Sequence, residues 1–237
     1  MTVPARGPRA VGGRPRSLGR SGRSELPALL RIVIATRSRH KLAELAELLR
    51  PAHAELVTLD ALGIDGDPVE DGLTFEANAR LKARFYARLS GLPTLADDSG
   101  IEVDALGGAP GVRTRRYAGE NATDLENNAK LLGALAGMAP RARGARYVCV
   151  LALVEPERAG VHGGLPITAE ARGTLRGRIA AGPRGTGGFG YDPIFEPLGE
   201  VPGGRTLGEQ SAAEKAAISH RARAARRMGR KLAALGY

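Results

Sequence analysis

The sequence predicts an α/β fold in which a mixed, twisted sheet is covered by helices. Three observations predict it. Short apolar runs typical of buried strands alternate with longer segments whose apolar residues repeat at helical spacing. This alternation continues from residue 31 to the C-terminus, which favours an interleaved sheet over separate helical and strand parts. The 237 residues, 43% of them hydrophobic and 25% charged, are enough for one large domain or two small ones.

The net charge of +10 is concentrated at the two ends of the chain. Residues 1–30 contain six arginines and one glutamate, and residues 215–231 contain seven lysines or arginines and no acid. Between them, residues 31–214 carry 22 basic and 24 acidic side chains, so the body is nearly neutral. With four Phe, five Tyr and no Trp, stacking platforms for nucleic acid are scarce. General nucleic-acid binding is therefore a weak interpretation.

Residues 1–30 are expected to form a disordered basic tail, and residues 31–237 the folded domain. The tail is rich in Gly, Arg, Pro and Ser without periodicity. A transit peptide, or a start codon placed too far upstream, would give a similar composition, and we favour a dispensable tail. No apolar run approaches the roughly 18 residues that cross a bilayer. The single cysteine, Cys149, excludes an internal disulfide, and we expect a soluble, cytoplasmic protein.

The first strand is expected at 31–35, followed by a polar loop at 36–41 and a helix with four leucines on one face. Ser38 can cap that helix, and Pro51 follows its end. The loop offers hydroxyls, cations and free backbone N–H groups at a helix N-terminus. Such a unit is suited to bind an anion.

A second strand is expected at 55–59, and a longer helix from about Thr74 to Ser90, ended by Gly91. Lys82 falls on the same face of this helix as its apolar stripe. Its stem either covers apolar surface while the ammonium reaches water, or the ammonium points into a cleft. The sequence alone leaves both interpretations open.

Two adjacent carboxylates, Asp97 and Asp98, occur where we expect a buried strand to end in a turn at Gly100. The open end of a strand is where α/β folds bind ligands. Carboxylates there are costly unless a cation meets them, and a divalent metal is the usual partner. A turn with two solvated aspartates is the alternative.

The remaining elements are expected to be a helix at about 122–136, strands near 145–154 and 166–175, a glycine-rich loop at 182–191 and a helix from about 212. The loop carries Phe189 and Tyr191 and leads to Asp192, which suits it to stack a base and read its edge. On the last helix, Lys215 and Ser219 lie one turn apart, so we expect cations and donors on one face.

Taken together, these sites suit a nucleoside phosphate. Residues 36–41 offer a phosphate site, and Glu70, Asp97 and Asp98 offer oxygen ligands suited to Mg²⁺. Each signal is weak alone, because the 36–41 loop lacks the glycines of an ATPase phosphate loop and the basic helix can be a solvated face.

Four motifs occur in order along the chain: Ala35-Thr36-x-Ser38-x-x-Lys41, Asp97-Asp98-Ser99-Gly100, Gly188-Phe189-Gly190-Tyr191-Asp192-Pro193 and Lys215-x-x-Ile218-Ser219-His220-Arg221. The chain resembles the inosine triphosphate pyrophosphatase family, the Ham1-like enzymes that clear noncanonical purine nucleoside triphosphates. The resemblance includes residues 70–75 and 106–112 and covers the chain from about residue 31.

The resemblance implies a two-lobed α/β protein, usually a homodimer, with an active-site cleft between the lobes. It implies Mg²⁺-dependent hydrolysis of ITP, dITP and XTP to the monophosphate and pyrophosphate. By position, Asp98 matches the proton acceptor and metal ligand, and Glu70 matches the second metal carboxylate. Asp97 is expected to hold Asp98 in position without itself binding the metal or the water.

Substrate contacts are also implied by position. Those for the triphosphate are Thr36, Arg37, Ser38, Arg39, His40, Lys41, Lys82 and Ser99. Those for the base are Phe189, Gly190, Tyr191 and Asp192, and the remaining substrate contacts are Lys215, His220 and Arg221. Two departures from the family pattern are Ser38 in place of the usual Asn and a more basic segment at 113–117. Specificity is expected at the purine 6-position, where donors would accept a keto oxygen and reject an amino group.

Two rival functions make different predictions. A Maf-like pyrophosphatase has a similar architecture but acts on pyrimidine or methylated nucleotides, and the motifs at 188–193 and 219–221 argue against it. A nucleic-acid-binding protein would use the tail and the last helix, and would bind DNA or RNA in a salt-sensitive way without catalysis.

Overall fold

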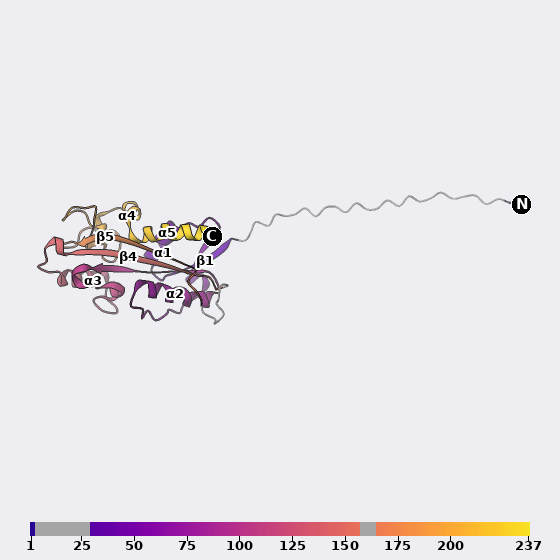
Figure 1. Cartoon of the computed structure of the whole chain (residues 1–237), viewed down its shortest axis with the longest axis horizontal. Helices are drawn as coiled ribbons and strands as arrows, with labels where there is room; N and C mark the ends of the chain where they lie inside the picture. The colour runs from indigo at the N-terminus through magenta and orange to yellow at the C-terminus, as the bar shows by residue number, and fades with distance from the viewer. Residues whose placement is uncertain (3–28, 157–164) are drawn as a thin grey trace.

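A six-stranded mixed sheet forms the centre of the molecule in the computed structural model, which describes residues 1–2, 29–156 and 165–237 (Figure 1). In chain order, the helices and strands are β1 (Leu30–Ala35), α1 (Arg39–Leu49), β2 (Ala54–Thr58), α2 (Phe75–Ser90), β3 (Thr94–Val103), α3 (Asp124–Ala134), β4 (Gly144–Val154), β5 (Ala169–Ile179), β6 (Phe195–Pro197), α4 (Ala212–Ile218) and α5 (His220–Ala234). The α/β prediction is confirmed. Most of the 1–30 tail lies outside the described residues.

The strand order is β2-β1-β3-β4-β5-β6. The pairs β1–β2 and β1–β3 are parallel, and the pairs from β3 to β6 are antiparallel. Helices α1 and α5 cover one face, and α2 and α3 lie on the other (Figure 1). None of the helices in the described ranges is long and apolar enough to span a membrane.

Strand β3 does not end at Asp97 and Asp98, so the expected turn at Gly100 is wrong. Its pairing with β4 continues without interruption from Thr94 to Val103. The strand that ends here is its neighbour β1, whose last paired residue, Ala35, lies opposite Ala96. Beyond this pair β3 has no β1 neighbour, so the strand end that lies beside Asp97 is that of β1.

The strand geometry separates the two carboxylates. Successive side chains of a strand point to opposite faces of the sheet. Asp97 accordingly faces α1 and α5, where it contacts Lys41, whereas Asp98 faces α2, where it contacts Lys82. The two aspartates cannot act as one chelating pair, and each organises a different cation.

The last helix is broken in two, so the expectation of one continuous helix is wrong. Ser219 has extended backbone angles (φ −60°, ψ 154°) and is both the C-cap of α4 and the N-cap of α5. Its hydroxyl accepts from the backbone N–H of Ala222 at 3.1 Å, which stabilises a new helix start. The glycine at position 173 of β5 lets α5 approach, because a Cβ there would lie 2.1 Å from the His220 carbonyl oxygen. The break places His220 and Arg221 in a buried first turn.

Candidate active site

The loop between β1 and α1 brings Lys41 to Asp97. The Ser38 hydroxyl caps α1 by accepting from the backbone N–H of Lys41, and the Thr36 hydroxyl accepts from the N–H of Ser38. The Lys41 ammonium lies 2.9 Å from an Asp97 carboxylate oxygen. Burial alone would raise the pKa of Asp97, but Lys41 and two further cations outweigh it and hold that pKa well below its usual range. Asp97 and Lys41 therefore form a buried ion pair in which the carboxylate positions the ammonium.

Arg37 does not lie with the other predicted site residues. Its guanidinium donates to Asp67 at 3.1 Å, to Asp60 at 3.2 Å and to the carbonyl oxygen of Gly66 at 3.3 Å. It thus holds the segment that leads toward Glu70. The side chain of Arg37 is placed to support a loop, and its predicted triphosphate contact would require these bonds to break.

Asp98 shares one ammonium with Glu70. The Lys82 Nζ lies 2.9 Å from Asp98 and 3.1 Å from Glu70, and the amide of Asn78 donates to Asp98 at 3.4 Å. Lys82 is 8% exposed, so of the two interpretations left open by the sequence, the structure supports the ammonium that points inward. Burial raises the pKa of Asp98 although Lys82 acts in the opposite direction. A carboxylate with a raised pKa is suited to accept a proton.

The chemistry of the Glu70–Asp98 pair suits a divalent cation. Both carboxylates already meet at a single positive charge, the Lys82 ammonium. Within the described ranges no group of three or more His, Cys, Asp or Glu side chains could hold a metal by itself. A pair of carboxylates is a donor set that Mg²⁺ commonly takes, with phosphate oxygens and water in its other positions.

A second network joins α1 to the C-terminal helices through Glu44. One carboxylate oxygen lies 3.0 Å from the Lys215 ammonium, and the other accepts from the Arg221 guanidinium. Arg221 also donates to the Ser99 hydroxyl at 3.1 Å, and Lys215 lies 2.8 Å from Asp192. Sequence reasoning missed Glu44. Its available signal was its position three residues after Lys41, on the same face of α1.

Glu44 should make the stability of the protein depend on pH. Burial would raise its pKa, but Arg221 and Lys215 outweigh the burial and lower it. Because the pKa of Glu44 is lower in the folded than in the unfolded protein, its carboxylate stabilises the fold at any pH above the pKa of the unfolded state. This contribution is lost as the pH falls through the pKa of the folded state. The free energy of unfolding should therefore fall more steeply from pH 5 to pH 3 in the wild type than in Glu44→Gln. Urea denaturation at each pH measures this.

The control for this experiment is Glu47→Gln, which changes an exposed glutamate on the same helix. Its pH dependence should match that of the wild type. Parallel curves for wild type and Glu44→Gln would contradict the assignment.

The glycine-rich loop, residues 182–191, presents Phe189 beside these cations. The Phe189 ring is stacked on His40 with centroids 5.0 Å apart, and the Lys215 ammonium lies 4.6 Å from its centroid. The backbone N–H of Phe189 donates to Asp192 at 3.0 Å. Only glycine fits at position 188, because φ is 74° and a Cβ would lie 2.0 Å from an Asp192 oxygen.

The tip of the loop is held by α3 and by Tyr191. Asp124 accepts from the N–H of Gly190 at 2.7 Å, and Asn128 donates to the carbonyl oxygen of the same residue at 3.1 Å. Tyr191 is 3% exposed and donates to the carbonyl oxygen of Thr114 at 2.7 Å. Of the two aromatics predicted for base stacking, Phe189 lies beside the cations, while Tyr191 packs in the core as an anchor.

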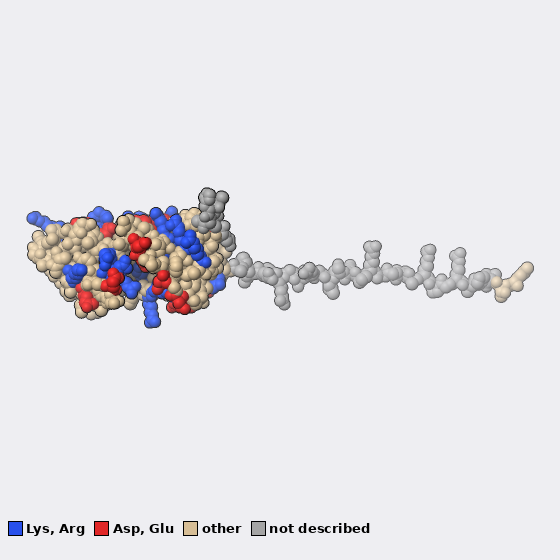
Figure 2. Space-filling model, turned by 90° about the horizontal axis from the view of Figure 1, so that it is seen from below, with Lys and Arg blue, Asp and Glu red and all other residues tan. Residues whose placement is uncertain are grey.

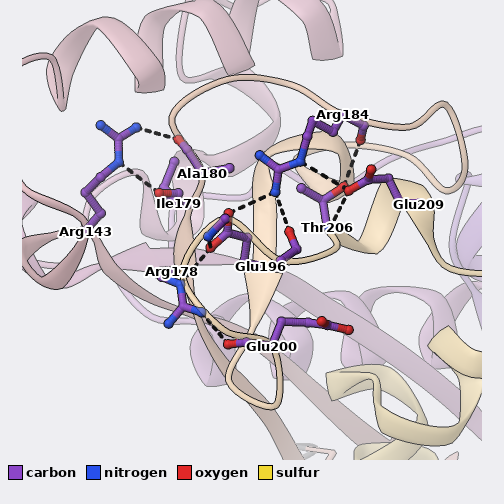
Figure 3. A network of polar contacts seen from close by, with 11 residues as sticks. Arg143, Arg178, Ile179, Ala180, Arg184, Glu196, Glu200, Thr206 and Glu209 are labelled. Carbon is purple, nitrogen blue, oxygen red and sulfur yellow. Dashed lines mark hydrogen bonds and ion pairs between the residues drawn. The ribbon is translucent and has the colours of Figure 1, made fainter.

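The beginning of the loop is fixed by the ion-pair network of Arg184 (Figure 3). The guanidinium lies 2.9 Å from Glu196 and 3.3 Å from Glu209, and the Arg184 carbonyl oxygen accepts from Thr206 at 2.8 Å. Three sides of the loop are thus tied to different elements. These contacts hold the backbone on both sides of Phe189.

His220 is buried and neutral. It is 4% exposed, and its ring is stacked on Tyr147 with centroids 4.6 Å apart and planes inclined by 6°. Burial and the nearby cations lower its pKa well below the usual value. Among the described residues, its Nδ1 and the Nε of Arg221 are buried without a hydrogen-bond partner. The Arg221 Nε can only donate, whereas the His220 Nδ1 donates or accepts according to the tautomer, so each atom is free to take a partner.

The face shown in Figure 2 carries one contiguous band of Lys and Arg near its edge and a mixture of both charges over the rest of the surface. Lys and Arg side chains are interspersed there with Asp and Glu. This arrangement agrees with the nearly neutral body seen in the sequence.

The fold and the site define an α/β protein in which buried lysine–carboxylate pairs lie near an aromatic ring, an arrangement suited to a nucleotide. This chain belongs to the Ham1 family, whose model matches residues 32–231. The predicted family resemblance is thereby confirmed.

Similar proteins agree on this family. A dITP/XTP pyrophosphatase of Syntrophobacter fumaroxidans is 49% identical over 81% of this chain and 78% of its own length. A dITP/XTP pyrophosphatase of Escherichia coli O157:H7 is 45% identical over 82% of this chain and 93% of its own length. Among solved structures, a HAM1 protein from Coxiella burnetii has a TM-score of 0.74 and 42% identity, covering 86% of this chain and 98% of its own. These likenesses span the described body.

Proposed function

We propose that the chain hydrolyses noncanonical purine nucleoside triphosphates, namely ITP, dITP and XTP, to the monophosphate and pyrophosphate. The observation that carries the proposal is a set of three lysines, Lys41, Lys82 and Lys215, each held by a buried aspartate, with the Lys215 ammonium lying over the ring of Phe189. The lysine ammonium groups can neutralise the charge of a triphosphate, and the aromatic ring can stack on a purine. The names of the relatives, dITP/XTP pyrophosphatases, support the same activity.

In the proposed reaction, a water oxygen attacks the α-phosphorus. The bond from that phosphorus to the bridging oxygen breaks, its electron pair leaves with pyrophosphate, and Asp98 accepts the proton of the water. Lys41 and Lys82 exchange their carboxylate partners for phosphate oxygens and stabilise the developing charge.

Glu70 and Asp98 are the residues that would hold Mg²⁺. When bound, the cation would neutralise phosphate charge and help to orient the water. The sharing of one ammonium by these two carboxylates supports the assignment.

Selectivity is proposed to come from His220 and Arg221. The Nε–H of Arg221, and the Nδ1 of His220 in the tautomer that carries its proton there, would donate to the 6-keto oxygen of hypoxanthine or xanthine. The 6-amino group of adenine would place a donor against donors, a mismatch that sites reject strongly. We further propose a homodimer in the cytoplasm, which rests on the resemblance to the family.

A substrate panel tests the function. With Mg²⁺, dITP and XTP should each yield one pyrophosphate per monophosphate, with kcat/KM at least about 100-fold above that for dATP. Omitting Mg²⁺ should remove most of the activity. The measurement is steady-state kinetics with separate detection of pyrophosphate and orthophosphate.

Three outcomes would contradict the proposal. Orthophosphate as the first product would indicate a different cleavage, and preference for pyrimidine or methylated triphosphates would favour the Maf-like alternative. Salt-sensitive DNA binding that disappears on deleting residues 1–30, without any hydrolysis, would favour the nucleic-acid alternative.

A further inference from the structure

His40 lies against the ring of Phe189, although its place in the 36–41 loop predicted a triphosphate contact. The ring centroids are 5.0 Å apart and the planes are inclined by only 13°, so the rings are in stacking contact with nothing between them. His40 belongs to the first turn of α1, and Phe189 belongs to the glycine-rich loop. The contact therefore joins two separate walls of the site.

Two other groups near the Phe189 ring are tied to several partners. The Lys215 ammonium, 4.6 Å from the ring centroid, is held by Asp192 and Glu44. Arg221, 5.5 Å away, is 2% exposed and also bound to Glu44. These cations cannot leave the ring without breaking buried ion pairs.

The imidazole of His40 is the group that can move. His40 is exposed, and its side chain has no hydrogen-bond or ion-pair partner within the part of the chain that the structure describes. Separating it from Phe189 breaks one ring stack and no polar contact. The face of Phe189 that His40 covers is therefore the face most easily opened to a flat ligand.

We propose that His40 and Phe189 are the two walls of the nucleobase slot and that the purine of the substrate binds between their rings. This inference rests on the proposed function. Insertion loses one ring–ring contact and forms two, so it gains about one base–aromatic stack. Stacking favours all purines alike. His40 thus contributes affinity for the base, while selection at the 6-position remains with His220 and Arg221.

A different role for His40 predicts the opposite effect. If the imidazole only covers Phe189 in the free protein and is expelled by the base, it competes with substrate. Removing it would then lower KM for the nucleotide. The direction of the change in KM thus distinguishes the two roles.

The experiment compares wild type, His40→Ala and His40→Phe for dITP hydrolysis and for inhibition by the two products. For His40→Ala we expect KM for dITP and the inhibition constant of dIMP to rise about tenfold, the loss of one base stack. We expect kcat to stay within about twofold, because the stack is made equally in the ground and transition states. The inhibition constant of inorganic pyrophosphate, which has no base, should not change, and His40→Phe should restore the wild-type values.

The matched control is His53→Ala, which removes an exposed imidazole that follows the end of α1, and it should behave as wild type. An unchanged or lower KM in His40→Ala overturns the inference. An equal rise in the inhibition constants of dIMP and pyrophosphate also overturns it. The variant would then have lost phosphate binding or the correct placement of α1, and not a contact with the base. If the wild type releases no pyrophosphate from dITP, the proposed function itself is overturned. If the wild type is active and His40→Ala behaves like it, only the binding of the base between His40 and Phe189 is overturned.

Discussion

Replacing Asp98 by asparagine is expected to lower kcat/KM for dITP by about 10³-fold or more. The carboxylate is 8% exposed, contacts the Lys82 ammonium at 2.9 Å and has a raised pKa. Asparagine keeps the shape but can neither accept the proton of water nor supply an anionic ligand to Mg²⁺. Loss of a positioned base alone costs about 10²- to 10⁴-fold. Single-turnover release of pyrophosphate measures the chemical step directly.

Asp97→Asn is the matched comparison, because it makes the same change one residue earlier in the same strand. Asp97 points to the other face of the sheet and positions Lys41. Its loss should weaken the binding of the triphosphate more than it slows chemistry, so kcat should fall less than in Asp98→Asn. Both variants should retain the wild-type circular dichroism spectrum. Equal losses of kcat in the two variants, or retained activity in Asp98→Asn, would contradict the division of roles.

Local sequence patterns predicted the positions of most helices and strands but misread strand β3. The pair of acids and the glycine at position 100 are typical of a turn, yet β3 continues to Val103. The reason is non-local. Ten consecutive pairings with β4 hold the strand, and the 3-10 helix at Gly111–Arg116 and α2 approach so closely that a Cβ at Gly100 would meet Phe75 at 2.9 Å. The glycine is there for close packing, which no local pattern reveals.

The site shows the same limit. Sequence reasoning brought together Lys41, Lys82 and Lys215 as phosphate contacts because positive charge near a predicted ligand site is visible in the sequence. It missed Glu44, whose importance depends on partners 171 and 177 residues away. The break at Ser219 had a local signal, since serine is a preferred helix cap, but no proline or glycine marked it.

Arg221→Ala is expected to lower the free energy of unfolding by about 3 kcal/mol, the lower end of the cost of breaking a buried ion pair. The side chain is 2% exposed and bridges Glu44 on α1 to Ser99 on β3. Its removal leaves Glu44 with Lys215 as a remaining partner, which limits the loss. Water can also hydrate the Glu44 carboxylate, which is partly exposed. Urea denaturation at pH 7 measures the change.

The control is Arg223→Ala, two residues further along α5. Arg223 is exposed and donates to one carbonyl oxygen, that of Thr174, so its loss should cost at most about 1 kcal/mol. The pair Arg221→Met with Glu44→Gln should lose less stability than the two single variants added together, because both single changes remove the same ion pair. Additive losses would mean that the two side chains stabilise the fold independently. Arg221 would then act through its packing, and the bridge from α1 to α5 would have no energetic role.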